Sequence, residues 1–132
     1  MKKIKKIKII KYSNKTGSLI PITFNKKIPI KVKRIFFIYG KKNKTRGNHA
    51  HKKSNQLFIH VSGTIILNIF SKKNKKKFVL NAKNKKLIFV PPMYWCNVKF
   101  VKNNSVLMVV SDRKYETNDY IRNYNEYLRK VK

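Results

Sequence analysis

Apolar and aromatic residues recur in short runs along most of the chain, and turn-forming residues separate these runs. Ile, Val, Phe and Tyr dominate them, and such side chains suit a pleated, half-buried strand. Asn, Lys, Gly and Ser fill the intervals, as at 14–17, 62–63 and 71–77. The pattern predicts strands at 5–12, 28–39, 55–63, 64–70, 76–81, 86–92, 95–101 and 105–111. Short strands at regular spacing without intervening helices indicate an antiparallel sandwich or barrel, so we expect an all-β protein.

The C-terminal segment changes from a strand period to a helical one. Residues 117–131 begin with cap-type residues and then place apolar side chains at helical spacing. The spacing predicts a helix over 117–131 whose apolar stripe packs on the sheet rather than forming a binding face. No internal repeat or Pro/Gly-rich linker interrupts the sequence, so residues 1–132 are expected to form one domain.

Size and cysteine content restrict the class of protein further. A chain of 132 residues can bury a core without disulfides or structural metals. Its single cysteine, Cys96, excludes an internal disulfide and is consistent with a reducing compartment. Lysines interrupt the basic N-terminus, and no window approaches the roughly 18 apolar residues of a spanning helix. We therefore expect a cytoplasmic protein that does not associate with membranes.

The charge is strongly basic, with 34 Lys and Arg residues against four Asp and Glu residues and a net charge of +30. Such a balance first suggests an anionic partner such as nucleic acid. Nucleic-acid surfaces favour clustered arginine, whereas lysine predominates here and is spread through most predicted turns. We interpret the lysines as a solvated coat and expect no nucleic-acid partner. The alternative, a nucleic-acid-binding barrel, predicts retention on DNA that falls steeply with salt.

Two histidines one residue apart, His49 and His51, form the most informative feature of the sequence. Alternate residues of a strand point to the same side, so an extended segment at 48–52 presents both imidazoles to one face. A single histidine is most simply a hydrogen-bonded structural residue. Two in phase, flanked by Arg46 and Asn48, favour a functional site. Because imidazole titrates near neutral pH, the pair is suited to proton transfer.

The spacing around this pair matches the first motif of cupin barrels, His-x-His-x4-Glu-x6-Gly, with Gln56 in the acidic position and Gly63 at the end. Downstream, Cys96 stands where a typical cupin metal site has its third histidine. A neutral amide does not supply the anionic ligand that a hard divalent cation prefers. Two imidazoles and a thiolate would suit zinc, but Cys96 is equally a small buried residue. We predict no metal.

Four motifs together, RGNHAHKKSNQ, VSG, PPMYW and VVSDRKYETNDYIRNYNEYL, resemble the dTDP-4-keto-6-deoxyglucose 3,4-ketoisomerases of deoxysugar biosynthesis. The resemblance runs from about Gly17 to Leu128, in order and with similar spacing. It implies a cupin double-stranded β-helix (jelly-roll barrel) with a short C-terminal helix, and a homodimer with exchanged N-terminal strands. It implies movement of a keto group from C-4 to C-3 of a dTDP-linked keto-deoxyhexose, without metal or cofactor, in the synthesis of surface glycans.

The resemblance also assigns roles to individual residues. His51 is carried over as the group that shuttles a proton between the two carbons through an enediol-type intermediate, and His49 as its polarising partner, with the reverse assignment left open. Arg46 is expected to bind diphosphate or sugar oxygens with its bidentate donors, or else to brace its loop. The other expected substrate-binding residues are Tyr39, Asn48, Gln56 and Trp95, of which Trp95 is equally suited to the core.

Three departures from the family pattern bear on activity. Cys96 replaces a histidine after the tryptophan, Phe37 replaces a tyrosine after Arg34, and Ser-Asp-Arg-Lys-Tyr replaces a more acidic stretch. The first two remove polar groups near the expected pocket but leave the histidine pair intact. We therefore predict an isomerase. The main alternative is a non-catalytic cupin that binds nucleotide sugar or carbohydrate.

Overall fold

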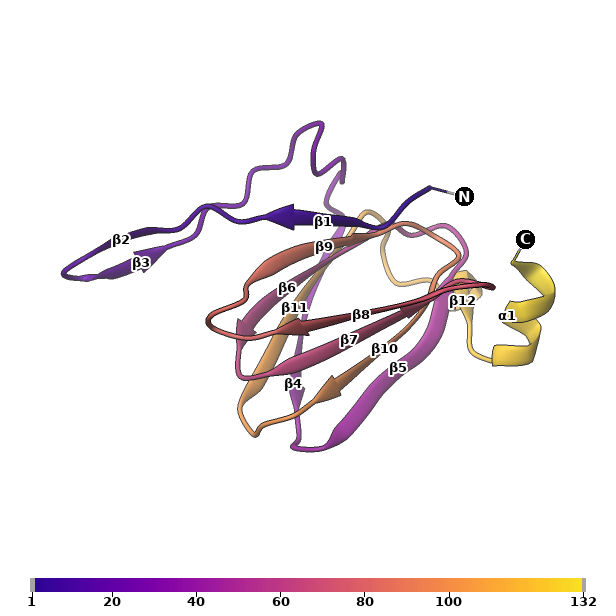
Figure 1. Cartoon of the computed structure of the whole chain (residues 1–132). Coiled ribbons are helices and arrows are strands. Elements are labelled where there is room, and N and C mark those ends of the chain that lie inside the picture. Colours follow the sequence, from indigo (N-terminus) through magenta and orange to yellow (C-terminus); the bar gives the residue numbers. More distant parts are fainter. Residues whose placement is uncertain (1, 132) are drawn as a thin grey trace.

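Two five-stranded antiparallel sheets face each other in the computed structural model, which describes residues 2–131 (Figure 1). The first sheet has the order β1 (Lys5–Lys8), β9 (Lys86–Val90), β6 (Gln56–Ser62), β11 (Ser105–Ser111), β4 (Arg34–Gly40). The second has the order β12 (Tyr120–Ile121), β5 (Lys44–His51), β10 (Trp95–Phe100), β7 (Ile65–Phe70), β8 (Lys75–Leu80). This is the double-stranded β-helix of a cupin, so the predicted all-β jelly-roll class is confirmed.

Alternating side chains from both sheets fill the space between them. Phe58, Leu107 and Val109 of the first sheet meet Leu67 and Ile69 of the second, and all five are buried. Because successive side chains of a strand point to opposite faces, these residues are spaced two apart within β11 and within β7. The two-residue period read from the sequence therefore marks the inner faces of the barrel.

A second apolar cluster covers the outer face of the first sheet and explains one difference from the predicted strands. The segment before β4 crosses this face and buries Ile28 and Ile30 against Leu57, Leu87 and Phe89. Strand pairing begins only at Arg34, so the strand predicted over 28–39 is correct for its second half alone. Alternating burial of an extended but unpaired segment gives the same two-residue period as a strand, and the sequence pattern does not distinguish them.

A separate two-stranded hairpin, β2 (Tyr12–Asn14) and β3 (Gly17–Leu19), extends from the barrel (Figure 1). Its turn is stabilised by Asn14, whose Oδ1 accepts a hydrogen bond from the Thr16 backbone N–H at 2.8 Å. Tyr12 and Leu19, which face each other across the hairpin, are each 61% exposed. These exposures show that the hairpin packs its apolar side chains on no other element among residues 2–131, and an isolated hairpin is at best marginally stable in water.

The C-terminal helix is shorter than the predicted 117–131. A 3-10 turn, η1 (Thr117–Asp119), leads into β12, and the helix α1 (Tyr124–Lys130) follows. Residues 120 and 121 do not form part of the helix despite their helical spacing, because Tyr120 and Ile121 pair with His51 and Ala50 of β5. Their backbone groups therefore make sheet hydrogen bonds in place of helical ones. The helix then begins at a cap, since the Asn123 side chain accepts from the Glu126 N–H at 2.9 Å.

The helix packs on the outer face of the second sheet, as its apolar stripe predicts. Tyr127 is fully buried and donates its hydroxyl to the backbone oxygens of Phe70 at 2.9 Å and Met93 at 3.1 Å. Trp95 and Val131 belong to the same buried cluster, together with Ala50 and Ile121. No helix within residues 2–131 is both long enough and apolar enough to cross a membrane.

Replacing Gly63 with alanine is expected to destabilise the fold by about 3 kcal/mol, because overpacking and a strained backbone act together. Gly63 has φ +76°, and an added Cβ would lie 2.6 Å from the Ser105 Cα. Urea denaturation followed by circular dichroism measures the loss. The control, Gly17→Ala in the hairpin, has φ +136° but no atom within 4 Å of the new Cβ. It should cost about 1 kcal/mol from the backbone alone, and equal losses would contradict the packing argument.

Candidate active site

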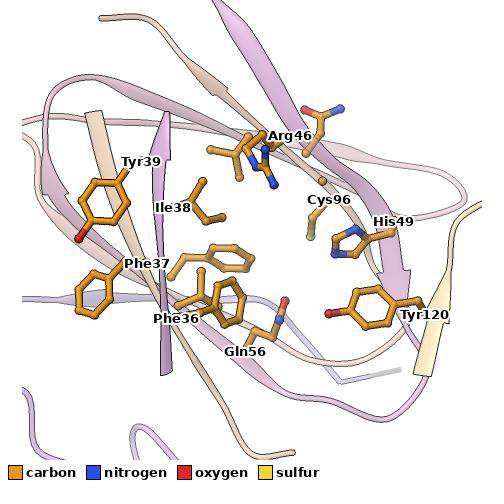
Figure 2. Close-up of a pocket in the computed structure, with 14 residues that line it drawn as sticks. Phe36, Phe37, Ile38, Tyr39, Arg46, His49, Gln56, Cys96 and Tyr120 are labelled. Carbon is orange, nitrogen blue, oxygen red and sulfur yellow. The ribbon is translucent and has the colours of Figure 1, made fainter. Parts of the chain in front are cut away.

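An open cavity of about 400 Å³ lies between the two sheets. Its floor and walls are mainly apolar, with Phe58, Val98 and Val109 among the residues that line it. A small set of polar side chains interrupts this surface: Arg46, His49, Gln56, Asn97 and Tyr120. Figure 2 shows His49 and Tyr120 on one side of the cavity and Phe36 and Ile38 on the other. An apolar pocket with a few convergent polar groups is the usual form of a small-molecule site.

A β-bulge in β5 determines how the histidines face the cavity. Asn97 of β10 pairs with Gly47 and Cys96 pairs with His49, which leaves Asn48 as the extra residue, with φ +58°. Gly47, with φ +97°, lies so close to β10 that an added Cβ would be 3.1 Å from the Cys96 carbonyl oxygen. The bulge therefore turns the strand, and the two histidines after it point to the same side, as their spacing predicts.

The two imidazole rings lie edge to face with their centroids 5.1 Å apart. His49 lines the cavity, whereas His51 is 6% exposed and is not among the residues that line it. His51 Nδ1–H donates to the Asp119 Oδ2 at 2.8 Å. This hydrogen bond fixes the tautomer, so the His51 Nε2 carries the lone pair, and Nε2 is buried with no hydrogen-bond partner among residues 2–131.

Asp119 is held as a carboxylate by three donors. Ser54 Oγ donates to Oδ2 at 2.5 Å, and the Lys53 backbone N–H donates to Oδ1 at 2.7 Å, in addition to His51. Burial alone raises the pKa of Asp119, but the hydrogen bonds from Ser54, His51 and Lys53 outweigh it and leave the pKa below its usual value. The ionised carboxylate orients His51 throughout the neutral pH range.

Both histidines are neutral at neutral pH. The pKa of His49 is lowered to about 4, mainly by burial and in addition by the neighbouring His51 and Arg122, while a hydrogen bond with the Gly47 backbone opposes the shift. Burial also lowers the pKa of His51, although Asp119 opposes this shift. An imidazole that is uncharged and lies against an apolar cavity is available to accept a proton from a bound molecule.

Tyr120 is a polar residue of the cavity that sequence reasoning missed. Its ring lies 4.9 Å from the His49 ring and 4.4 Å from the His51 ring, centroid to centroid. Arg34 donates through Nη2 to the Tyr120 hydroxyl at 3.4 Å, and the Arg122 guanidinium lies 4.3 Å above the Tyr120 ring. The sequence placed Tyr120 in a helix, and only its pairing with His51 in the sheet shows that it faces the histidines. Asp119 was missed for the same reason.

The structure brings most of the predicted binding residues to the cavity, but not all. Arg46, Gln56 and Tyr39 line it, with Gln56 buried and Tyr39 75% exposed at the rim. Asn48 and Trp95 are not among the lining residues. Asn48 accepts from the Asn97 Nδ2 at 3.1 Å, and Trp95 packs on Tyr124 and Tyr127 of α1. Trp95 therefore has the core position that the sequence left open.

Cys96 lines the cavity, but its chemistry does not favour a zinc site. Burial raises the pKa of the Cys96 thiol to about 12, so the thiolate that zinc requires is disfavoured. No group of three or more His, Cys, Asp or Glu side chains with metal-binding geometry occurs among residues 2–131. The thiol instead contributes a small apolar surface opposite His49 in the strand register.

Stability is expected to fall in mild acid because the pKa of each of the three histidines, His49, His51 and His60, is lowered in the fold. The unfolded chain binds protons near the usual pKa of 6.5, whereas folded His49 binds one only near 4. The contribution of these histidines to the free energy of unfolding is therefore complete above about pH 6.5, and it is lost as the pH falls toward 4.

Urea unfolding at about pH 7.5 and about pH 5 measures this loss. His49→Asn removes one of the three titrating groups and should show a smaller decrease between the two pH values. Equal free energies of unfolding at both pH values in the wild-type protein would contradict the lowered pKa values.

The fold and the cavity define a cupin with an acid–base site inside its barrel. The chain belongs to the FdtA family (WxcM-like, C-terminal), whose model matches residues 2–132, and this confirms the resemblance read from the motifs. It is 31% identical over 124 residues to the TDP-4-oxo-6-deoxy-alpha-D-glucose-3,4-oxoisomerase of Aneurinibacillus thermoaerophilus, covering 93% of this chain and 88% of that one.

Solved structures of two related enzymes share the whole fold. QdtA, a sugar 3,4-ketoisomerase from Thermoanaerobacterium thermosaccharolyticum in complex with TDP, superposes with a TM-score of 0.89 at 30% identity, over 97% of this chain and 93% of that one. The WlaRB TDP-quinovose 3,4-ketoisomerase of Campylobacter jejuni superposes with a TM-score of 0.86 at 32% identity, over 98% of this chain and 99% of that one.

Proposed function

We propose that the protein is a nucleotide-sugar 3,4-ketoisomerase, which moves the keto group of a dTDP-linked 4-keto-6-deoxyhexose from C-4 to C-3. The family and its characterised relatives support the reaction class. The cavity supports the substrate class, since its apolar walls suit a sugar ring with a methyl group at C-6 and its rim carries the cationic Arg46. A guanidinium binds diphosphate oxygens in bidentate fashion.

His49 is the group that relays the carbon-bound proton in this proposal. The C-3 proton lies next to a carbonyl and is therefore acidic, so its removal gives an enediol-type intermediate that can be protonated at C-4. Only a group in contact with the sugar can do this, and of the two histidines His49 lines the cavity. His51, held by Asp119, lies edge to face against His49 and positions it. This exchanges the roles that the family resemblance first suggested.

The neutral His49 imidazole on the cavity wall is the observation that carries the proposal. Incubating the protein with dTDP-4-keto-6-deoxyglucose and following the sugar by NMR, with and without chelator, tests it. A 3-keto product formed in the presence of chelator is the expected result. Saturable dTDP binding without turnover would instead support a non-catalytic cupin, and activity lost on chelation would support a metal centre.

We further infer that the protein is a homodimer in which N-terminal strands are exchanged. The β2–β3 hairpin extends from the barrel with Tyr12 and Leu19 exposed (Figure 1). The edge strand β4 has a row of exposed apolar side chains, formed by Ile35, Phe37 and Tyr39, of which Phe37 and Tyr39 also border the cavity. Within residues 2–131 the hairpin has no packing surface and β4 pairs with a strand on one side alone, so the two are complementary between two copies of the chain.

Leu19→Glu and Phe37→Glu are each expected to shift the protein from dimer to monomer, because a buried charge opposes association at an apolar contact. Sedimentation velocity across a concentration series measures the change. The control is Val79→Glu, which places the same charge at an exposed apolar residue of β8, away from the hairpin and from β4. Three variants with the same sedimentation behaviour as the wild type would contradict this interface.

We also infer that the enzyme acts in the cytoplasm and supplies a deoxysugar for surface glycans. Its single cysteine, Cys96, is a free thiol, as in proteins of reducing compartments. A 3-keto sugar is an intermediate rather than an end product, because its carbonyl is reactive. A following enzyme that aminates or reduces C-3 is therefore expected to consume it.

A further inference from the structure

We propose that Tyr120 is a catalytic residue that moves the oxygen-bound proton of the reaction, and that Arg34 positions it. The inference depends on the proposed 3,4-ketoisomerase function. Moving a keto group between neighbouring carbons transfers two protons, one between C-3 and C-4 and one between their oxygens. His49 accounts for the first transfer, and the second requires a separate donor and acceptor inside the cavity.

Tyr120 is the phenol best placed for this role. Figure 2 shows its hydroxyl directed into the cavity, toward Gln56 and next to His49. Its ring contacts both imidazoles, at centroid distances of 4.9 Å and 4.4 Å. The phenylalanines that line the cavity, Phe36, Phe37 and Phe58, have no hydroxyl, and Tyr39 is largely exposed at the rim. A phenol can both donate and accept a proton, as the two steps require.

Arg34 gives this phenol a fixed position and a cationic neighbour. Its Nη2 donates to the Tyr120 hydroxyl at 3.4 Å. The guanidinium is held between two rings, 4.9 Å from the Phe36 centroid and 5.5 Å from the Tyr115 centroid. Its Nε is buried and has no hydrogen-bond partner among residues 2–131. A cation beside the oxygen stabilises the phenolate that forms when Tyr120 gives up its proton.

The balanced sequence uses both residues and returns them to their starting state. His49 takes the C-3 proton, the C–H electrons form the C-3–C-4 double bond, and the carbonyl π electrons move to O-4. Tyr120 gives its proton to O-4, which completes a neutral enediol and leaves a phenolate beside Arg34. The phenolate takes the O-3 proton as the C-3 carbonyl forms, and C-4 takes the proton from the His49 imidazolium. C-3 is oxidised as C-4 is reduced, so the electrons balance within the sugar.

Tyr120→Phe tests the role, because phenylalanine keeps the ring contacts and removes only the hydroxyl. The variant and the wild type are incubated with dTDP-4-keto-6-deoxyglucose in D2O, and proton NMR follows two rates. One is formation of the 3-keto sugar, and the other is exchange of the C-3 proton in the unreacted substrate. Isomerisation should fall about 100-fold, whereas exchange, which needs only His49, should fall less than about tenfold, so the ratio of exchange to product rises.

Tyr124→Phe is the matched control, since this tyrosine lies on α1 against Trp95 and outside the cavity. It should leave both rates at the wild-type values. Arg34→Gln is a second variant, and it should raise the same exchange-to-product ratio by a smaller factor, with wild-type secondary structure by circular dichroism. If Tyr120→Phe does not fold, the exchange-to-product ratio of Arg34→Gln tests the proposal in its place.

The outcomes separate this inference from the proposed function. Failure of the wild type to form the 3-keto sugar would overturn the ketoisomerase function itself. Wild-type turnover combined with an unchanged ratio in Tyr120→Phe and Arg34→Gln would overturn only the role of Tyr120. A parallel fall of both rates is the signature of a structural role and would also overturn it.

Discussion

Replacing His49 with asparagine is expected to reduce the rate of isomerisation by about 1,000-fold, within the range that a positioned acid–base group contributes. Asparagine preserves much of the size and polarity of the side chain, but its amide does not accept a proton at neutral pH. Substrate binding should change little, because Arg46 and the apolar walls of the cavity are untouched. The loss should therefore appear in kcat rather than in KM, and a coupled assay or NMR of the keto sugar measures it.

His60→Asn is the control for this variant. His60 is a second buried histidine on β6, and its Nε2–H donates to the Gly63 carbonyl at 2.7 Å, away from the cavity-lining residues. Its replacement should lower the free energy of unfolding while leaving kcat near the wild-type value. If His49→Asn retained wild-type kcat, the proton relay would have to be assigned to another group, and the proposed mechanism would be wrong.

Asp119→Asn is expected to lower both activity and stability. The Asp119 carboxylate accepts hydrogen bonds from His51, Ser54 and the Lys53 backbone N–H, and a neutral amide does not replace this charged acceptor. The free energy of unfolding should fall by about 2 kcal/mol, because hydrogen bonds to a charged group are among the stronger ones. The isomerisation rate should fall about 100-fold, the lower end of the acid–base range, because His51 acts by positioning His49.

Asp112→Asn provides the matched comparison for the charge change. Asp112 accepts from the Asn55 backbone N–H at 2.9 Å and from the Asn55 Nδ2 at 2.7 Å, and neither contact involves a histidine. This variant should lose stability without a comparable loss of kcat. Thermal unfolding and initial rates on both variants separate the two effects. Equal kcat values for Asp119→Asn and Asp112→Asn would contradict the positioning role of Asp119.

Several features of the fold follow directly from local sequence. β6 and β7 lie within one or two residues of their predicted limits because Ser62 and Gly63 separate two runs of β-forming residues, and the tight turn requires a glycine with positive φ. His49 and His51 point to the same face of β5 because side chains two residues apart in a strand share a face. Their spacing to Gln56 and Gly63 also indicated the cupin barrel. These features depend on residues that are close together in the chain, so they can be predicted from the sequence alone.

Other features depend on contacts between distant segments. The bulge at Asn48 requires β10 opposite β5: Gly47 and Asn48 permit the positive φ angles, but the shift in register arises only from the pairing with β10. The segment 117–121 has helical spacing, yet it forms a 3-10 turn and a strand because β5 offers it a free edge. Trp95 was a candidate pocket residue, and its position under α1 depends on which face of β10 is turned outward.

The sequence by itself determined the class of fold and identified the histidine pair, because strand periodicity and motif spacing are local properties of the chain. Only the tertiary structure decided how the residues of the site are arranged. It placed His49 on the cavity wall with the buried His51 against it, and it brought Asp119 and Tyr120 to them from nearly 70 residues further along the chain. The physical reason is that proton transfer depends on contact, burial and hydrogen-bond direction, and these arise only when the two sheets close around a common cavity.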